Sequence, residues 1–289
     1  PAPLHGWPAN SAWDVVAGGA TADGWQARLR LRHKVLGATV DKILLLRDGH
    51  PFLYQEHVFS GGEGEVPVAH HPMTAMRNGG KLAFSPKRLA LTPDQSLEPD
   101  PARGRSLLAY PARAAALDGF PTAAGGMTSL HDYSAGDLRE DFVTLIEADH
   151  DGLGWTAVAR EAEADLFLVL KNPRDLPVTM LWISNGGRDY APWNGRHLGV
   201  LGVEDGRAAA GHKASIGDNA LKREGVPTTL RLGGEARFRQ VIGALPMVGR
   251  SSPPVDVVAV DKGLRLGFTD GKDVIVPFDT MFLAQPLAS

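Results

Sequence analysis

The 289-residue sequence contains no cysteine, which excludes disulfide bridges, thiolate metal sites and a cysteine nucleophile. It also has no excess of charge of one sign, because the formal net charge is −3 and Lys and Arg are scattered along the chain. A chain without a basic field is poorly suited to concentrate a nucleic acid or an anionic membrane surface. We therefore expect no nucleic-acid partner and a neutral or weakly charged small molecule as ligand.

Long apolar runs are missing as well. Stretches such as Ile43–Leu46 and Val241–Val248 are far shorter than the ~18–20 residues that span a bilayer. The sequence begins with Pro1, and no basic segment followed by an apolar one comes after it, so a signal peptide is either absent or already removed. We expect no membrane partner, and the lack of cysteine makes the cytoplasm the default location.

Glycine and proline are abundant instead. The 34 glycines and 21 prolines make up about 19% of the chain, against ~12% in an average protein. Between them lie short segments rich in β-formers, and the Asp48-Gly49 and Asp270-Gly271 pairs are typical of hairpin turns. Strands are predicted at residues 25–31, 35–46, 52–59, 81–84, 141–147, 155–160, 165–170, 178–184, 255–260, 264–268 and 274–278. We expect one antiparallel sandwich, which the strands after Pro254 extend.

Three segments place titratable groups among glycines, prolines and aromatic residues, where a turn can expose them beside a stacking surface. They are Leu4–Trp13 (LHGWPANSAW), Val66–Met76 and Leu181–Asn219. The first resembles the His-Gly segment of the aldose 1-epimerase (galactose mutarotase-like) family. His71-Pro72 resembles the second histidine motif of that family, and GVEDG, which contains Glu204, resembles its glutamate-bearing strand. The order and the spacing agree too, with 66 residues from His5 to His71 and 133 from His71 to Glu204.

The resemblance extends from His5 to about Gln240. It implies an all-β, antiparallel β supersandwich of the galactose mutarotase-like type, with residues 1–289 forming a single domain. The strands that family members carry before the first histidine are absent, so either the chain is truncated or this branch closes its sandwich differently. Ala9 stands where the family has an arginine, which removes a bidentate donor for sugar hydroxyls or a phosphate. Met73-Thr74 replaces the usual aromatic pair.

The resemblance also implies the chemistry, which interconverts the anomers of an unphosphorylated hexose or a related sugar. Glu204 is assigned as the base, His71 as the acid at the ring oxygen, and His5 as a second donor. A glutamate whose pKa is raised toward neutrality and a histidine suit these tasks near pH 7, and the reaction needs no metal or organic cofactor. Aromatic and polar side chains of the third segment are candidates for sugar binding: Trp182, Asn185, Arg188, Asp189, Tyr190, Trp193, Asn194 and Arg196.

Other interpretations stay open. Residues 204–206 also read as a charged hairpin turn, and Trp182 and Trp193 as core residues. His70 and His71 are poor joint metal ligands, because adjacent strand residues point to opposite faces. A sugar-binding or sensing protein without turnover is the main alternative, which Ala9 favours. A lyase or a glycosidase comes third, and only Glu204 and Asp189 qualify as the two glycosidase carboxylates. The oligomeric state stays open.

Overall fold

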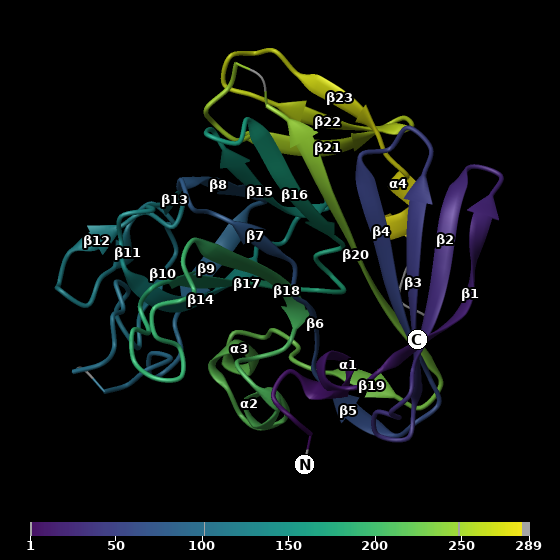
Figure 1. Ribbon diagram of the computed structural model, residues 1–289, viewed down its shortest axis with the longest axis horizontal. Coiled ribbons are helices and arrows are strands. Elements are labelled where there is room, and N and C mark those ends of the chain that lie inside the picture. The colour runs from purple at the N-terminus through teal and green to yellow at the C-terminus, as the bar shows by residue number, and fades with distance from the viewer. Residues whose placement is uncertain (1, 101, 248, 285–289) are drawn as a thin grey trace.

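The computed structural model describes residues 2–100, 102–247 and 249–284, which form mainly antiparallel β-strands and their connections (Figure 1). The predicted all-β, antiparallel fold class is confirmed, and each predicted strand segment overlaps a strand of the structure. Within the described part of the chain, none of the helices has the length and apolarity needed to cross a bilayer.

The larger main sheet combines strands that are far apart in the sequence. Its nine strands follow one another in this order: β1 (Trp13–Thr21), β2 (Gly24–Leu31), β3 (Thr39–Arg47), β4 (Phe52–Ser60), β20 (Glu235–Pro246), β16 (Asp165–Lys171), β15 (Gly154–Arg160), β8 (Gly80–Phe84) and β13 (Asp132–Tyr133). β2, β3 and β4 form the predicted N-terminal meander, and the unpredicted β1 precedes them. β20 then joins this meander to strands from the middle of the chain.

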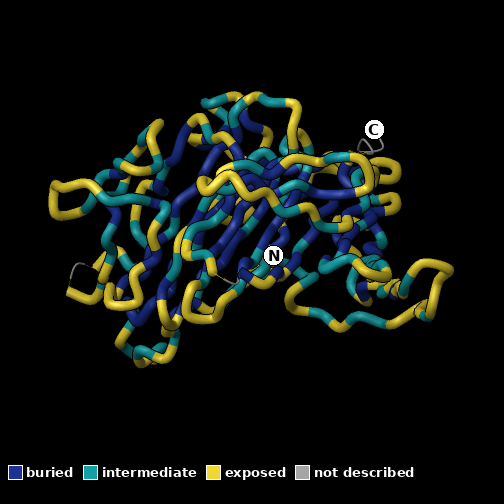
Figure 2. Tube along the Cα trace, turned by 90° about the horizontal axis from the view of Figure 1, so that it is seen from above, coloured by how far each residue is buried: buried dark blue, intermediate teal, exposed yellow. Residues whose placement is uncertain are grey.

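The smaller main sheet lies against part of the larger one. Its strands are β10 (Arg113–Ala114), β9 (Lys87–Leu91), β14 (Arg139–Glu147), β17 (Val178–Asn185), β18 (Val200–Arg207) and β6 (Val68–His70), and β7 (Met73–Ala75) also pairs with β18. An apolar core fills the space between the two sheets, with side chains from β8, β15 and β16 on one side and from β14, β17 and β18 on the other. Figure 2 shows buried residues along these central strands and exposed residues in the loops around them.

The remaining elements cover the ends and outer faces of the sandwich. The short strands are β5 (Gly64–Val66), β19 (Leu230–Leu232), β11 (Phe120–Pro121) and β12 (Met127–Thr128), which form two two-stranded sheets. The helices are short: α1 (Gly6–Asn10), α2 (His212–Ile216), α3 (Ala220–Arg223) and α4 (Thr280–Ala284). Leu221 of α3 packs with Ile146, Val178 and Met180 on the smaller sheet. This contact covers part of the face that points away from the larger sheet, called the outer face below.

The expectation that the strands after Pro254 pair with the sandwich is wrong. β21 (Asp256–Val260), β22 (Gly263–Gly267) and β23 (Val274–Pro277) form a separate three-stranded sheet and pair with no other strand of the described residues. Their apolar side chains, with those of α4, pack on the larger sheet from the side opposite the smaller one. These strands therefore contact the sandwich through side chains and do not extend either of its sheets.

Alternation along β17 and β18 decides which residues reach the outer face. Leu181 and Ile183 lie in the core between the sheets, so Trp182 between them points outward. In the same way Val203 lies in the core and Glu204 points outward. Residues 204–206 belong to β18, so the hairpin-turn interpretation is wrong.

Candidate functional site

The site is built around a histidine and a glutamate on neighbouring strands. His71 follows the last residue of β6, and β6 pairs with β18 so that His70 lies opposite Asp205. This register brings His71 beside Glu204, with 3.0 Å between Nε2 of His71 and Oε1 of Glu204. Their side chains keep 29% and 12% of their surfaces exposed, so both remain within reach of a ligand.

The electrostatics of the pair favour an imidazolium beside a carboxylate. Burial lowers the pKa of His71, but the hydrogen bond and the charge of Glu204 outweigh burial and raise this pKa above its ordinary value. A raised pKa keeps more of the imidazole protonated near pH 7. His71 is thereby suited to donate a proton.

A glycine allows the side chains of this site to lie close to the backbone of β18. Gly202 lies opposite Trp182 in the ladder between β17 and β18. A Cβ atom at this position would lie 3.1 Å from Cε1 of His71, 3.3 Å from Cβ of Trp182 and 3.5 Å from Oε1 of Glu204. The Trp182 ring stands edge-on to His71, with 6.0 Å between their centroids. Three functional side chains therefore surround a position without a side chain.

His5 reaches the same place from the N-terminal segment. Its φ of 61° and the φ of 71° at Gly6 are left-handed, and this turn leads the chain into α1. The exposed His5 ring stands edge-on to His71 at 5.8 Å. The three residues assigned to catalysis thus come together although they lie far apart in the chain, while their catalytic roles stay a prediction.

His70 and His71 point to opposite sides, as expected for adjacent strand residues. The buried His70 ring packs edge-on against Phe238 of β20 at 4.9 Å, inside the sandwich. Among the described residues there is no group of three or more His, Asp or Glu side chains that could hold a metal ion.

One side of the site, called the wall below, consists of aromatic and charged side chains: Trp182, Arg188, Trp193 and His197. Nε1 of Trp182 donates to Oε1 of Glu140 at 2.6 Å, and Arg188 donates to the same oxygen at 2.6 Å. The Arg188 guanidinium lies over the Trp193 ring, 3.8 Å from its centroid. His197 stands edge-on to Trp182 and Trp193, at 6.0 Å and 5.3 Å. Both tryptophans are half-buried, so neither is a plain core residue.

Several candidates have their polar atoms engaged elsewhere. Asn185 is 3% exposed and bonds to the Ala135 and Asp137 carbonyls and to the Gly199 N–H, so it holds loops together and is not a ligand residue. Arg196 donates to the carbonyls of Trp193 and Pro192, within its own turn. The assignment of Asn185 is corrected, because its side chain is buried and its polar atoms are bonded, whereas Arg196 is exposed and its role in sugar binding stays a prediction.

Three further candidates lie in the same loop. Asp189 is paired with Arg105 and half-exposed, so the second glycosidase carboxylate is already engaged. Tyr190 lies under the Arg103 guanidinium at 3.8 Å. Asn194 is exposed at a left-handed turn position, with a φ of 52°. None of the described ring contacts or hydrogen bonds joins these three side chains to His71 or Glu204.

The sequence interpretation missed Glu140 and Gly202. Glu140 belongs to a run of three charged residues, Arg139–Asp141, at the start of β14, which continues with mostly apolar residues up to Glu147, and all three are buried. Charged residues in a predicted buried strand are a signal of internal ion pairs. No sequence signal distinguished Gly202 from the other glycines.

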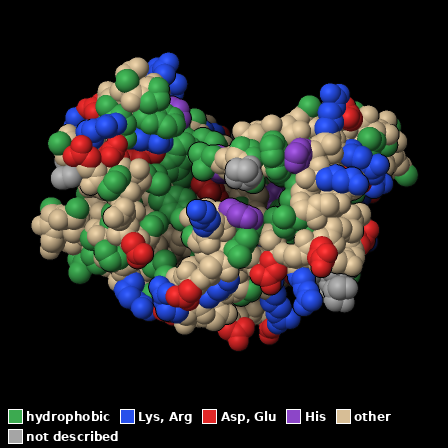
Figure 3. All heavy atoms as spheres, turned by 90° about the horizontal axis from the view of Figure 1, so that it is seen from below, with side chains coloured by type: hydrophobic (Ala, Val, Ile, Leu, Met, Phe, Trp, Pro, Cys, Tyr) green, Lys and Arg blue, Asp and Glu red, His purple; other side chains and the backbone are tan. Residues whose placement is uncertain are grey.

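Figure 3 shows the lower face of the molecule hollowed between two lobes, with histidine and acidic side chains in the hollow. A separate recess of about 310 Å³ is lined by Gly80, Tyr133, Glu161 and other residues, but not by His71 or Glu204. This recess is therefore distinct from the site at His71 and Glu204.

Comparisons with known proteins give likenesses of fold. No family model and no curated protein sequence matches the chain. Among solved structures, a candidate aldose 1-epimerase from Escherichia coli K12 aligns at 12% identity over 81% of this chain and 68% of its own, with a TM-score of 0.49. A candidate aldose 1-epimerase from Klebsiella pneumoniae aligns at 15% identity over 79% and 53%, with a TM-score of 0.43. A galactose mutarotase related enzyme from Lactobacillus acidophilus aligns at 12% identity over 86% and 76%, with a TM-score of 0.48. Likenesses at this level say nothing about activity.

Proposed function

We propose that the protein is an aldose 1-epimerase-like isomerase that interconverts the anomers of an unphosphorylated hexose or a related sugar. The observation that carries this proposal is the pairing of His71 with Glu204 at 3.0 Å, with the Trp182 ring edge-on to His71. Anomer interconversion requires an acid and a base at the sugar ring, and an aromatic side chain beside them can stack on the apolar face of the sugar.

In the proposed reaction, Glu204 removes the proton of the anomeric hydroxyl. The electron pair left on that oxygen forms the carbonyl bond while the bond from the anomeric carbon to the ring oxygen breaks, and His71 donates a proton to the ring oxygen. Rotation of the free aldehyde and reversal of these steps give the other anomer. A sugar ring between the two groups would replace their mutual contact by one contact to each.

An uncharged sugar fits the charges of the wall. The positive charge of Arg188 is compensated by Glu140, and that of Arg105 by Asp189. Neither arginine offers an unbalanced charge to a phosphate, in agreement with Ala9 in the first motif. We propose the cytoplasm as the location, as the cysteine-free sequence suggests.

A sugar-binding protein without turnover is the second candidate. It is favoured by Ala9, which removes a donor from the first motif, and by the direct contact that His71 and Glu204 make with each other. The two functions differ in whether the protein accelerates the reaction.

The deciding experiment follows the mutarotation of D-glucose and D-galactose by NMR, corrected for the spontaneous rate. Glu204→Gln keeps the shape of the side chain but cannot accept the anomeric proton, so the rate should fall ~10²–10⁴-fold while sugar binding persists. Glu63→Gln, at an exposed glutamate, is the control and should behave as the wild type. A wild-type protein that binds sugars but accelerates none of a broad aldose panel would establish the binding function instead.

A further inference from the structure

Glu140 is a buried carboxylate on β14 that lies away from the proposed proton-transfer pair. Its side chain is 3% exposed. Its Oε1 accepts from Nε1 of Trp182 and from Arg188, both at 2.6 Å, and its Oε2 accepts from Oγ of Ser184 at 2.7 Å. One carboxylate thus joins a strand neighbour, the site tryptophan and a loop arginine.

A buried carboxylate is costly unless donors compensate its charge. Here the donors are themselves the wall of the site, so the charge of Glu140 and the positions of Trp182 and Arg188 depend on one another. The next residue, Asp141, is equally buried but accepts from the backbone N–H groups of Leu107 and Leu108. Only Glu140 of this pair is therefore tied to the site.

The two donors have defined places in the wall. With its N–H held by Glu140, the Trp182 indole also stands edge-on to His71 at 6.0 Å. With one nitrogen held by Glu140, the Arg188 guanidinium lies 3.8 Å from the Trp193 centroid and 5.9 Å from that of Trp182. An indole and a guanidinium have several rotamers each, and a shared acceptor selects one combination.

We propose that Glu140 is a positioning residue that orders the aromatic and guanidinium wall against which a neutral pyranose binds. It acts through Trp182 and Arg188 and does not touch the sugar itself. This inference rests on the proposed function for its kinetic effect, while the ordering of the wall can be measured without any sugar.

The variants are Glu140→Gln, Glu140→Asp and the matched control Asp141→Asn, which changes an equally buried acid on the other face of the same strand. Loss of hydrogen bonds to a charged group should raise KM for D-glucose or D-galactose roughly tenfold or more in Glu140→Gln, with kcat within about threefold. Glu140→Asp keeps the charge on a shorter side chain and should recover part of the affinity. Asp141→Asn should lower stability and leave KM nearly unchanged.

The wall itself is read out by ¹⁹F NMR of protein labelled with 5-fluorotryptophan. The chain has six tryptophans, and the Trp182 signal is assigned by its loss in Trp182→Phe. We expect this signal to shift or broaden in Glu140→Gln and to stay in place in Asp141→Asn.

An unchanged Trp182 signal in folded Glu140→Gln would overturn the inference, and so would a KM increase no larger than that of Asp141→Asn. A fall in kcat with unchanged KM would also overturn it, since it would place Glu140 in proton transfer. If the wild type neither binds nor interconverts sugars, the proposed function fails. The Trp182 signal then decides alone whether Glu140 orders the wall.

Discussion

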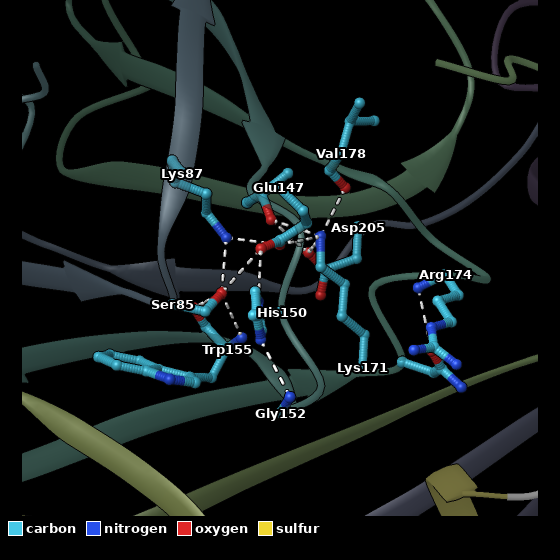
Figure 4. Close-up of polar contacts among 12 residues, drawn as sticks. Ser85, Lys87, Glu147, His150, Gly152, Trp155, Lys171, Arg174, Val178 and Asp205 are labelled. Atoms are coloured by element: carbon cyan, nitrogen blue, oxygen red, sulfur yellow. Dashed lines mark hydrogen bonds and ion pairs between the residues drawn. The ribbon is translucent and has the colours of Figure 1, made fainter. Parts of the chain in front are cut away.

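Replacing Lys171 by methionine should strongly destabilise the fold, because this lysine lies at the centre of a buried charge network (Figure 4). Its side chain is 1% exposed, and Nζ lies 3.0 Å from Oε1 of Glu147 and 3.0 Å from Oδ1 of Asp205. Nζ also donates to the Val178 carbonyl at 2.8 Å and to Oγ1 of Thr179 at 2.7 Å. Burial lowers the pKa of Lys171, but the charges of Asp205 and Glu147 outweigh burial and raise it. The lysine is thus charged and connects β16 to the opposite sheet.

The size of the expected loss in stability depends on the charges that stay buried when methionine replaces Lys171. Removing one partner of a buried ion pair costs about 3–5 kcal/mol, because the other charge stays buried without compensation. Asp205 would keep Gln240 Nε2 at 2.9 Å, and Glu147 would keep Lys87 and Ser85. These remaining donors place the expected loss near the lower end, at about 3 kcal/mol.

Urea unfolding followed by circular dichroism measures the change, provided that the m-value stays constant. Arg174→Met is the control: Arg174 pairs with Asp151 at 2.9 Å, but the two side chains are 74% and 97% exposed, so the loss should be at most ~1 kcal/mol. Adding Asp205→Asn to Lys171→Met removes an unpaired charge and should recover part of the stability. Equal losses for Lys171→Met and Arg174→Met would refute the reasoning.

Further predictions concern pH and the site. The pKa of His71 should lie above that of an unfolded histidine in an NMR titration and should fall in Glu204→Gln, because burial then acts without the opposing charge of Glu204. The stability that His71 contributes is present below its unfolded pKa and is lost as pH rises through the folded one. Burial raises the pKa of Glu147, but Lys171 and Lys87 outweigh burial and lower it, so its contribution is present above its unfolded pKa and is lost on acidification. Urea midpoints between pH 3 and 6 should therefore depend less on pH in Glu147→Gln. Gly202→Val should displace His71 or Trp182, because even a Cβ at this position would lie 3.1 Å from Cε1 of His71 and 3.3 Å from Cβ of Trp182, and sugar binding should weaken in an NMR titration. Unchanged affinity would show that binding does not depend on the arrangement of these two side chains.

The sequence located most of the longer strands because their apolar and β-branched runs are separated by glycine and proline turns, but it gave none of the strands of two or three residues. It missed β1, whose WDVVAGGAT sequence is mostly exposed and shows no apolar alternation. It also gave no strand to β20, which pairs with β4 and β16 although more than sixty residues separate it from either. Pairing between distant strands depends on how the whole core packs, and local sequence does not record it.

The candidate site, like the fold, could be predicted from the sequence only in part. The spacing of His5, His71 and Glu204, with the family resemblance, was enough to select these residues from the sequence alone. The meeting of His71 and Glu204 depends on the register of β6 on β18 and on the alternation along β18, which points Glu204 outward and Asp205 inward. Glu140 could not be assigned from the sequence, because its three donors come from β17 and from the loop after it. Motifs can mark the chemical groups, whereas only the tertiary structure decides which buried charges hold them, since a hydrogen bond depends on a few ångströms in space and not on distance along the chain.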